Sequence, residues 1–275
     1  MSTIRPPAVA GLFYPGLQTV LSRNLDELML RAATHGKQGK LKGLIAPHAG
    51  YVYSGYTAAT GYKLLKERPF SSVIIVGPSH REYFNGVSIY DGDAFKTPLG
   101  DVEVDAGLRD QLVHAWKDIA LTDTGHAAEH SVEVQLPFLQ RVLGSFSFVP
   151  VVMGDQRREY CNRLAEAIGE VCAGKDVLLV ASSDLSHYHP YKVAIELDRM
   201  VLNQIEHYDP EGLMEKLEAE ELEACGGGPV AAVMMAARKL GANSSQILHY
   251  CNSGDVSGEK DAVVGYVSAA LFQEE

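Results

Sequence analysis

The chain has 275 residues, 46% of them hydrophobic and 21% charged, an ordinary composition for a globular protein with a substantial core. A formal net charge of −11, with Lys and Arg scattered, argues against binding to nucleic acid or to acidic membranes. No apolar run reaches about 18 residues and the first residues carry no apolar signal core, so we expect a cytoplasmic protein that crosses no membrane.

Short apolar runs alternate along the chain with stretches of helical periodicity. In chain order, we expect strands at 41–46, 72–76, 87–90, 99–104, 146–153, 177–181, 246–251 and 262–271. We expect helices at 54–67, from Asp105 to about 116, 131–143 with a kink or restart at Pro137, 157–172, 193–207, 210–219 and 229–240. This alternation predicts a single α/β domain over residues 1–275, with three α/β/α layers and a mainly parallel central sheet.

Two histidines lie just past predicted strands. His48 stands in Pro47-His48-Ala49-Gly50-Tyr51, and His80 in Gly77-Pro78-Ser79-His80. Ligands of open α/β sheets bind beyond the carboxyl ends of the strands. A single histidine at such a place is often only bonded within its loop, but the repeated arrangement favours a pair of metal ligands. Neutral imidazole suits Zn, Cu, Fe and Ni, so the pair leaves the metal open.

Cys225 precedes three glycines and Pro229, a residue favoured in the first turn of a helix. A thiol at a helix N-terminus has a stabilised thiolate, which makes it a better ligand or nucleophile. The glycine run is otherwise a flexible turn, or it presents free amides to an anion. No Lys-Ser/Thr pair follows, so this is not a nucleotide-binding P-loop.

Asp184 and His187 follow the strand predicted at 177–181. In one interpretation Asp184 caps the next helix and His187 lies at the surface. In the other, Asp184 orients an imidazole or binds the ligand, and His187 acts as acid or base because imidazole titrates near neutral pH. The sequence lacks a Gly-x-Ser-x-Gly elbow, so a serine hydrolase is poorly supported.

The stretch His126-Ala127-Ala128-Glu129-His130 matches the His-x-x-Glu-His signature of zinc peptidases, which places both histidines on one helical face. It begins beside Gly125 at a predicted helix start, so the peptidase is the weaker interpretation. We expect Glu129 or His130 to line a different site.

The remaining cysteines and the acidic run have ordinary explanations. The length of the chain and its lack of a signal segment argue against a disulfide scaffold. Cys161 and Cys172 fall in one helical pattern and are expected to pack in the core. The acidic run at 215–223 is expected to be a solvated helix face, from which Glu221 or Glu223 could add a carboxylate near Cys225.

Seven segments, in this order and over nearly the whole chain, resemble the Memo family. They include Arg5-Pro6-Pro7, Pro47-His48-Ala49-Gly50-Tyr51 and Gly77-Pro78-Ser79-His80, and in full they are residues 5–15, 47–55, 77–80, 129–133, 183–187, 225–226 and 253–255.

The resemblance implies a fold similar to class III extradiol dioxygenases, which are non-haem iron enzymes. It places His48, His80 and Cys225 where those enzymes hold two histidines and a carboxylate, and His187 where they hold an acid/base histidine. A thiolate in place of the carboxylate makes the site softer and more oxidisable, which suits Cu(I) or Zn as well as Fe. Ring-cleaving activity therefore does not carry over. The resemblance also implies copper or iron binding with redox effects, phosphopeptide ligands in animal members and a radical-SAM partner protein in prokaryotes.

We therefore expect a metal-binding protein that holds Fe(II) or Cu, or else Zn, at His48, His80 and Cys225. If it is an enzyme, it is a dioxygenase-like oxidoreductase for a small substrate, with a catalytic group made of His187, Asp184, His130 and Glu129. The rival hypothesis is a non-catalytic module that holds an anionic or phosphorylated ligand in the same pocket. A homo-oligomer is compatible with either.

Overall fold

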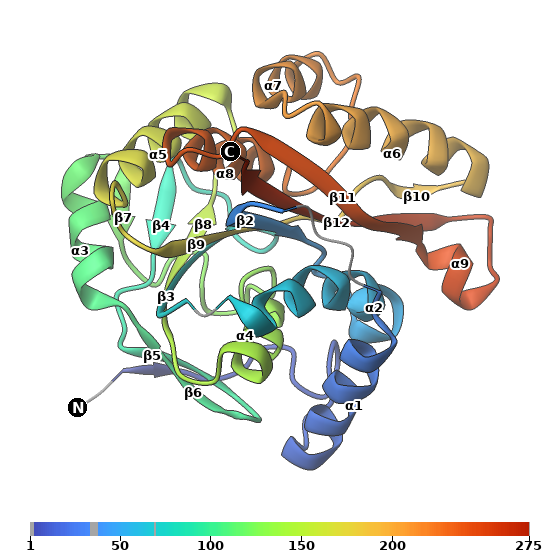
Figure 1. Cartoon of the computed structure of the whole chain (residues 1–275), viewed down its shortest axis with the longest axis horizontal. Helices are drawn as coiled ribbons and strands as arrows, with labels where there is room; N and C mark the ends of the chain where they lie inside the picture. Colours follow the sequence, from blue (N-terminus) through green and yellow to red (C-terminus); the bar gives the residue numbers. More distant parts are fainter. Residues whose placement is uncertain (1–2, 34–37, 69, 275) are drawn as a thin grey trace.

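Four parallel strands form the centre of the sheet in the computed structural model, which describes residues 3–33, 38–68 and 70–274 (Figure 1). They are β8 (Ser147–Met153), β3 (Ser72–Pro78), β9 (Val177–Ser182) and β2 (Lys40–Ala46), in that spatial order. Helices cover both faces of these strands, and strands buried in this way are read in a sequence as nearly unbroken apolar runs. The predicted α/β fold with a mainly parallel sheet is confirmed.

The sheet extends beyond this centre on both sides, to twelve strands within the described residues. Beyond β8 lie β6 (Gly100–Val104), β5 (Ala94–Thr97), β1 (Ile4–Arg5), β4 (Val87–Ile89) and β7 (Ile119–Leu121). Beyond β2 lies β12 (Val263–Gln273), which pairs antiparallel with β2, β11 (Ser244–Asn252) and β10 (His187–His189). The two predicted C-terminal strands thus form one long antiparallel pair.

Helices cover the two faces of the sheet as separate layers, each with its own core (Figure 1). Successive strand residues point to opposite faces, so Leu44 contributes to one core and Ile45 to the other. One layer comprises α1 (Gln18–Arg31), α2 (Tyr51–Tyr62) and α4 (Leu136–Leu143). The other comprises α3 (Ala106–Ala115), α5 (Arg158–Val171), α6 (Tyr191–Glu206), α7 (Pro210–Glu218) and α8 (Gly227–Lys239).

Three short helices complete the described structure: the 3-10 helices η1 (Lys63–Glu67) and η2 (Glu133–Gln135), and α9 (Ser253–Ser257). In the described part of the chain, the structure holds no helix with the length and apolar character needed to cross a membrane.

The main differences from the sequence-based expectations lie in short or weakly patterned elements. Pro137 stands in the first turn of α4 directly after η2, so the predicted helix at 131–143 restarts there. Helix α1 was not predicted, although Leu21, Leu25 and Leu28 are buried at helical spacing. Exposed apolar side chains on the same helix, among them Leu30, make its apolar face hard to recognise in the sequence. Strands β1, β5, β7 and β10, which have four residues or fewer, were not predicted either.

Arg5 ties the N-terminal segment to η2, through a buried ion pair, and to the loop before η2, through hydrogen bonds. Arg5 Nη1 lies 2.6 Å from Glu133 Oε2, and both side chains are almost fully buried. Arg5 also donates hydrogen bonds to the carbonyl oxygens of His126 and Glu129, at 2.6 and 2.5 Å. Glu133 accepts further hydrogen bonds from groups in the segment 8–14. One guanidinium–carboxylate pair therefore holds the loop in place.

Removal of Arg5 should cost much of the stability of the protein. In Arg5→Ala the Glu133 carboxylate stays buried without its partner, and we expect the free energy of unfolding in urea to fall by about 3–5 kcal/mol. The control is Arg141→Ala, whose ion pair with Asp26 is solvent-exposed and should contribute about 1 kcal/mol or less. Equal losses in the two variants would contradict this account of the Arg5–Glu133 ion pair.

Candidate metal centre

The site lies where three neighbouring parallel strands end. Ala46 of β2 pairs with Ser182 of β9, and β3 lies on the other side of β9. His48 and His80 each follow the last residue of their strand by two positions, and so does Asp184. The chain therefore delivers side chains from three separate loops to one edge of the sheet, as the sequence pattern predicts.

His48, His80 and Cys225 meet at this edge. One ligand atom from each lies within 4.8 Å of the other two, a spacing at which the three could hold a metal ion. His48 Nε2 is 3.1 Å from Cys225 Sγ. Two imidazoles and one thiol form a donor set that fits a transition metal such as Zn, Cu or Fe.

The buried carboxylate of Glu129 fixes His80. It accepts hydrogen bonds from the His80 amide at 2.6 Å, from His80 Nδ1 at 2.9 Å, and from the amides of His130 and Ser131 at 2.9 and 2.8 Å. Burial raises the pKa of Glu129, but the hydrogen bonds from His80 and Ser131 outweigh it and lower that pKa to about 2. Because an ionised carboxylate only accepts, His80 Nδ1 carries a proton, and in the neutral imidazole Nε2 is then the atom with the free lone pair.

His48 is buried and is held at two points. Its amide donates to Asp184 Oδ1 at 2.8 Å, and its Nδ1 lies 2.9 Å from Ser182 Oγ. Burial, followed by the neighbouring His80 and His130, lowers the pKa of His48 well below its usual range, so the imidazole is neutral.

Asp184 anchors the backbone of the loop that carries His48. Burial raises the pKa of Asp184 to about 7, against the opposing effect of hydrogen bonds from the amides of His48 and Ala49. It does not cap the next helix, because α6 begins at Tyr191.

The Cys225 thiol is half-buried. It accepts a hydrogen bond from the Asp184 amide at 3.2 Å. Burial, followed by the nearby Asp184 carboxyl, raises the pKa of Cys225 far above its usual range. The expectation that the helix N-terminus stabilises the thiolate is therefore wrong for the metal-free protein, because burial outweighs the amide hydrogen bonds. Binding of a cation would release the thiol proton.

The glycines after Cys225 serve packing. Their amides donate to Ser183 Oγ at 3.0 Å, to the Ala224 carbonyl at 3.2 Å and to Gln156 Oε1 at 2.9 Å. The expectation that they present free amides to an anion is therefore wrong. A Cβ on Gly226 would overlap the Ser182 carbonyl oxygen, so glycine lets Cys225 approach the end of β9.

Two further histidines flank the three candidate ligands. The His130 ring stacks on His80 with centroids 4.6 Å apart and meets His48 edge-on at 5.3 Å. Burial lowers the pKa of His130 to about 4. His187 Nδ1 donates to the Leu185 carbonyl at 2.8 Å, which leaves its Nε2 unprotonated. Burial also lowers the pKa of His187.

Glu223, which the sequence suggested as a carboxylate near Cys225, instead accepts from the His187 amide and contacts His189 Nε2.

The peptidase interpretation is wrong. Residues 126–128 form a turn and residues 129–130 are irregular, so the helical face that the signature requires does not exist. His126 packs against the rings of Tyr90 and Phe95 at centroid distances of 5.6 and 6.3 Å, whereas His130 lies with His80. Among the described residues, no candidate ligand group includes His126.

Sequence reasoning passed over the polar side chains that support the ligands, above all Ser182 and Gln135. Both are buried and hydrogen-bonded to each other. The available signal was a polar residue in an otherwise apolar stretch, since such residues are kept for their hydrogen bonds.

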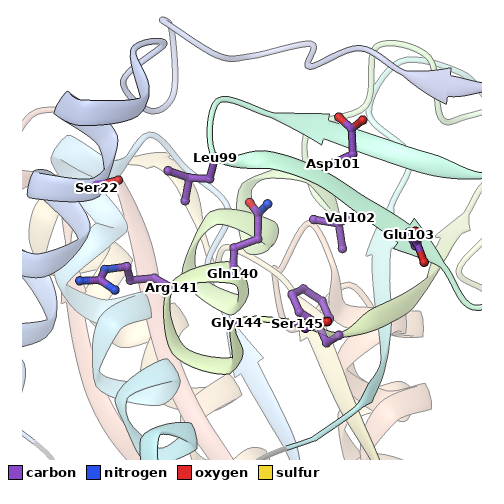
Figure 2. Close-up of a pocket in the computed structure, with 10 residues that line it drawn as sticks. Ser22, Leu99, Asp101, Val102, Glu103, Gln140, Arg141, Gly144 and Ser145 are labelled. Carbon is purple, nitrogen blue, oxygen red and sulfur yellow. The ribbon is translucent and has the colours of Figure 1, made fainter.

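A separate pocket of about 720 Å³ lies near the start of β8, at the opposite end of the parallel strands (Figure 2). Its lining residues come from α1, from the β5–β6 hairpin, from α4 and from the turn at 144–146. It brings together no histidine or cysteine, and the candidate metal centre does not extend into it.

Comparison with known proteins identifies close relatives of the whole chain. A family model described as Memo-like protein matches residues 5–270. A MEMO1 family protein of Methanosarcina mazei is 41% identical over 98% of this chain and 99% of its own length. A MEMO1 family protein of Thermoplasma volcanium is 39% identical over 98% of this chain and 99% of its own length.

A solved structure supports the fold alone. The crystal structure of an uncharacterized protein from Escherichia coli K12 matches with a TM-score of 0.55 and 13% identity, over 84% of this chain and 100% of that one.

The buried His126 should make stability depend on pH. Burial, followed by the nearby Arg5, lowers the pKa of His126 to about 3, against 6.5 for an ordinary histidine. Between about pH 6.5 and pH 3, His126 binds a proton in the unfolded chain but not in the folded one. The free energy of unfolding therefore falls as the pH drops from 6.5 towards 3. The His126→Phe variant keeps an aromatic ring and removes this loss, which approaches about 1.4 kcal/mol per pH unit.

Urea unfolding of both proteins at pH 7, 6 and 5 measures the difference. The wild-type protein should lose more stability on acidification than the variant. Parallel losses would show that His126 does not titrate as its burial predicts.

Proposed function

This chain belongs to the Memo-like protein family, and on that basis we propose that it binds a transition metal ion through His48, His80 and Cys225. The observation that carries the proposal is the convergence of these three side chains within 4.8 Å, from three separate loops. Their surroundings support it. Burial keeps His48 neutral, as a metal ligand must be, and Glu129 leaves His80 Nε2 free to coordinate.

The donor set favours Fe(II) or Cu, with Zn as a further candidate. Imidazole suits all three metals, whereas a thiolate shifts preference towards softer ions such as Cu(I) and Zn. The thiol must lose its proton on binding, so affinity should rise with pH.

We further propose that the centre performs redox or oxygen-linked chemistry on a small substrate. A bound iron or copper ion would supply a Lewis acid and a redox-active centre. His187 is the best candidate to move protons, because its Nδ1 is held by a carbonyl and its neutral Nε2 is available as a base. His130, stacked on His80, is a second neutral imidazole beside the same ligands.

Elemental analysis of protein purified without oxygen or added metal tests the binding proposal. We expect close to one equivalent of iron or copper in the wild type and at least a tenfold lower content in Cys225→Ser, because a serine hydroxyl is a poor ligand for soft ions. The matched control is Cys251→Ser, which removes a half-buried thiol that is hydrogen-bonded to the Thr57 hydroxyl. Equal metal in the two serine variants would contradict the proposal.

Oxygen uptake tests the role of His187. With a panel of small oxygenated compounds, any uptake by the metal-loaded wild type should fall by about 10²-fold or more in His187→Gln. Metal content should stay unchanged, because His187 lies outside the group of candidate ligands. Loss of metal together with activity would instead make His187 part of the ligand set. Unchanged uptake would remove it from the reaction.

A further inference from the structure

The imidazoles of the candidate centre differ in what holds their Nδ1 atoms. His80 Nδ1 faces the Glu129 carboxylate, and His187 Nδ1 faces the Leu185 carbonyl. Both partners can only accept a hydrogen bond, so each of them by itself places a proton on Nδ1 of its histidine. His48 Nδ1 faces the hydroxyl of Ser182, which can donate or accept. The tautomer of His48 therefore depends on where the Ser182 proton points.

The surroundings of Ser182 settle that direction. Its Oγ lies 2.6 Å from the carbonyl oxygen of Ser131, and two oxygens approach so closely only with a proton between them. The carbonyl has no proton to give, so the hydroxyl donates. A hydroxyl carries one proton, and both lone pairs of Ser182 Oγ are left to accept.

Gln135 takes one of these lone pairs and His48 takes the other. Gln135 Nε2 donates to Ser182 Oγ at 2.9 Å and to the Pro47 carbonyl at 3.0 Å. Because the Pro47 carbonyl can only accept, it fixes which end of the amide faces Ser182. At the other end, Gln135 Oε1 accepts from the Tyr62 hydroxyl at 2.7 Å.

We propose that Ser182 and Gln135 are positioning residues that set the tautomer of His48, holding its proton on Nδ1 and turning a bare Nε2 towards Cys225. In this arrangement His48 Nε2 accepts the Cys225 S–H across 3.1 Å, and a metal ion would take the place of that proton. All members of the chain from Tyr62 to His48 are buried, so water does not compete for these hydrogen bonds. The functional part of this inference rests on the metal site proposed above.

If the proposal holds, residues that do not ligate the metal contribute to the metal affinity of the site. Partners that orient a ligating histidine change metal affinity by about 10–100-fold when they are removed. Ser182→Ala takes away the acceptor for His48 Nδ1–H, and the opposite tautomer, which places a proton where the ion must bind, becomes accessible. Gln135→Met removes the second donor to Ser182 and should have a smaller effect in the same direction.

Two measurements on Ser182→Ala test the proposal. The first is ¹⁵N NMR of the metal-free protein, with the His48 ring signals assigned by their loss in His48→Gln. We expect the wild type to show a protonated Nδ1 and an unprotonated Nε2, and the variant to show a mixture. The second is titration with Co²⁺ alone, in which we expect the affinity of the variant to fall by about 10–100-fold.

The control is Ser245→Ala, at a buried serine of β11 whose hydroxyl likewise donates to backbone carbonyls, those of Ile205 and Glu206. It should keep both the wild-type His48 tautomer and the wild-type Co²⁺ affinity.

A wild-type His48 with its proton on Nε2, or a Ser182→Ala protein with unchanged tautomer and affinity, would overturn the inference. If wild-type protein binds no Co²⁺, the metal proposal fails, and the NMR result still decides whether Ser182 sets the tautomer.

Discussion

Glu129 carries a negative charge in the interior of the protein, and the geometry of the candidate site follows from how that charge is satisfied. Burial of an unpaired carboxylate costs free energy, so a buried carboxylate needs hydrogen-bond donors around it. Here they are the amide and ring of His80 and the amides of His130 and Ser131. These hydrogen bonds join the loop that carries Glu129 and His130 to His80, just past the end of β3. Arg5 stabilises the same loop by donating to the Glu129 carbonyl. The N-terminal segment is thereby part of the site's support, although it supplies no candidate ligand.

The second constraint is the absence of charge on two of the candidate ligands, His48 and Cys225. Burial lowers the pKa of His48 and raises that of Cys225, so both are neutral in the metal-free protein. In the tautomer proposed for His48, their contact at 3.1 Å is a hydrogen bond from thiol to imidazole, which adds to the hydrogen bond that the thiol accepts from the Asp184 amide. A cation bound at the proposed site would displace one proton and meet a thiolate, with the Glu129 carboxylate on the other side of the His80 ring. The three candidate ligand atoms already lie within 4.8 Å of one another in the metal-free protein.

Much of this was accessible from the sequence, because strand ends are marked by the change from apolar runs to Gly, Pro and His. His48 and His80 could be singled out on that ground, and Cys225 by the glycines and proline of the helix start that follows it. The three converge. The support of these residues could not be foreseen, since it depends on contacts between distant segments, such as Arg5 with Glu133 and Ser182 with Gln135. The position of Cys225 before a helix also led to a wrong expectation for the protonation state of its thiol. A helix N-terminus favours a thiolate, but burial, which only the tertiary structure reveals, acts more strongly. The His-x-x-Glu-His match failed because residues 126–128 form a turn and residues 129–130 are irregular, which the local pattern did not indicate.

The most direct test of the central claim is X-ray absorption spectroscopy of the zinc-loaded protein, because it reports the ligand atoms whatever metal the cell supplies. The account predicts nitrogen scatterers at about 2.0–2.1 Å with the outer-shell pattern of two imidazoles, and one sulfur at about 2.3 Å. The sulfur should vanish when Cys225 is replaced by Ser. A first shell of nitrogen and oxygen alone in the unaltered protein would contradict it, and would place the ion away from Cys225.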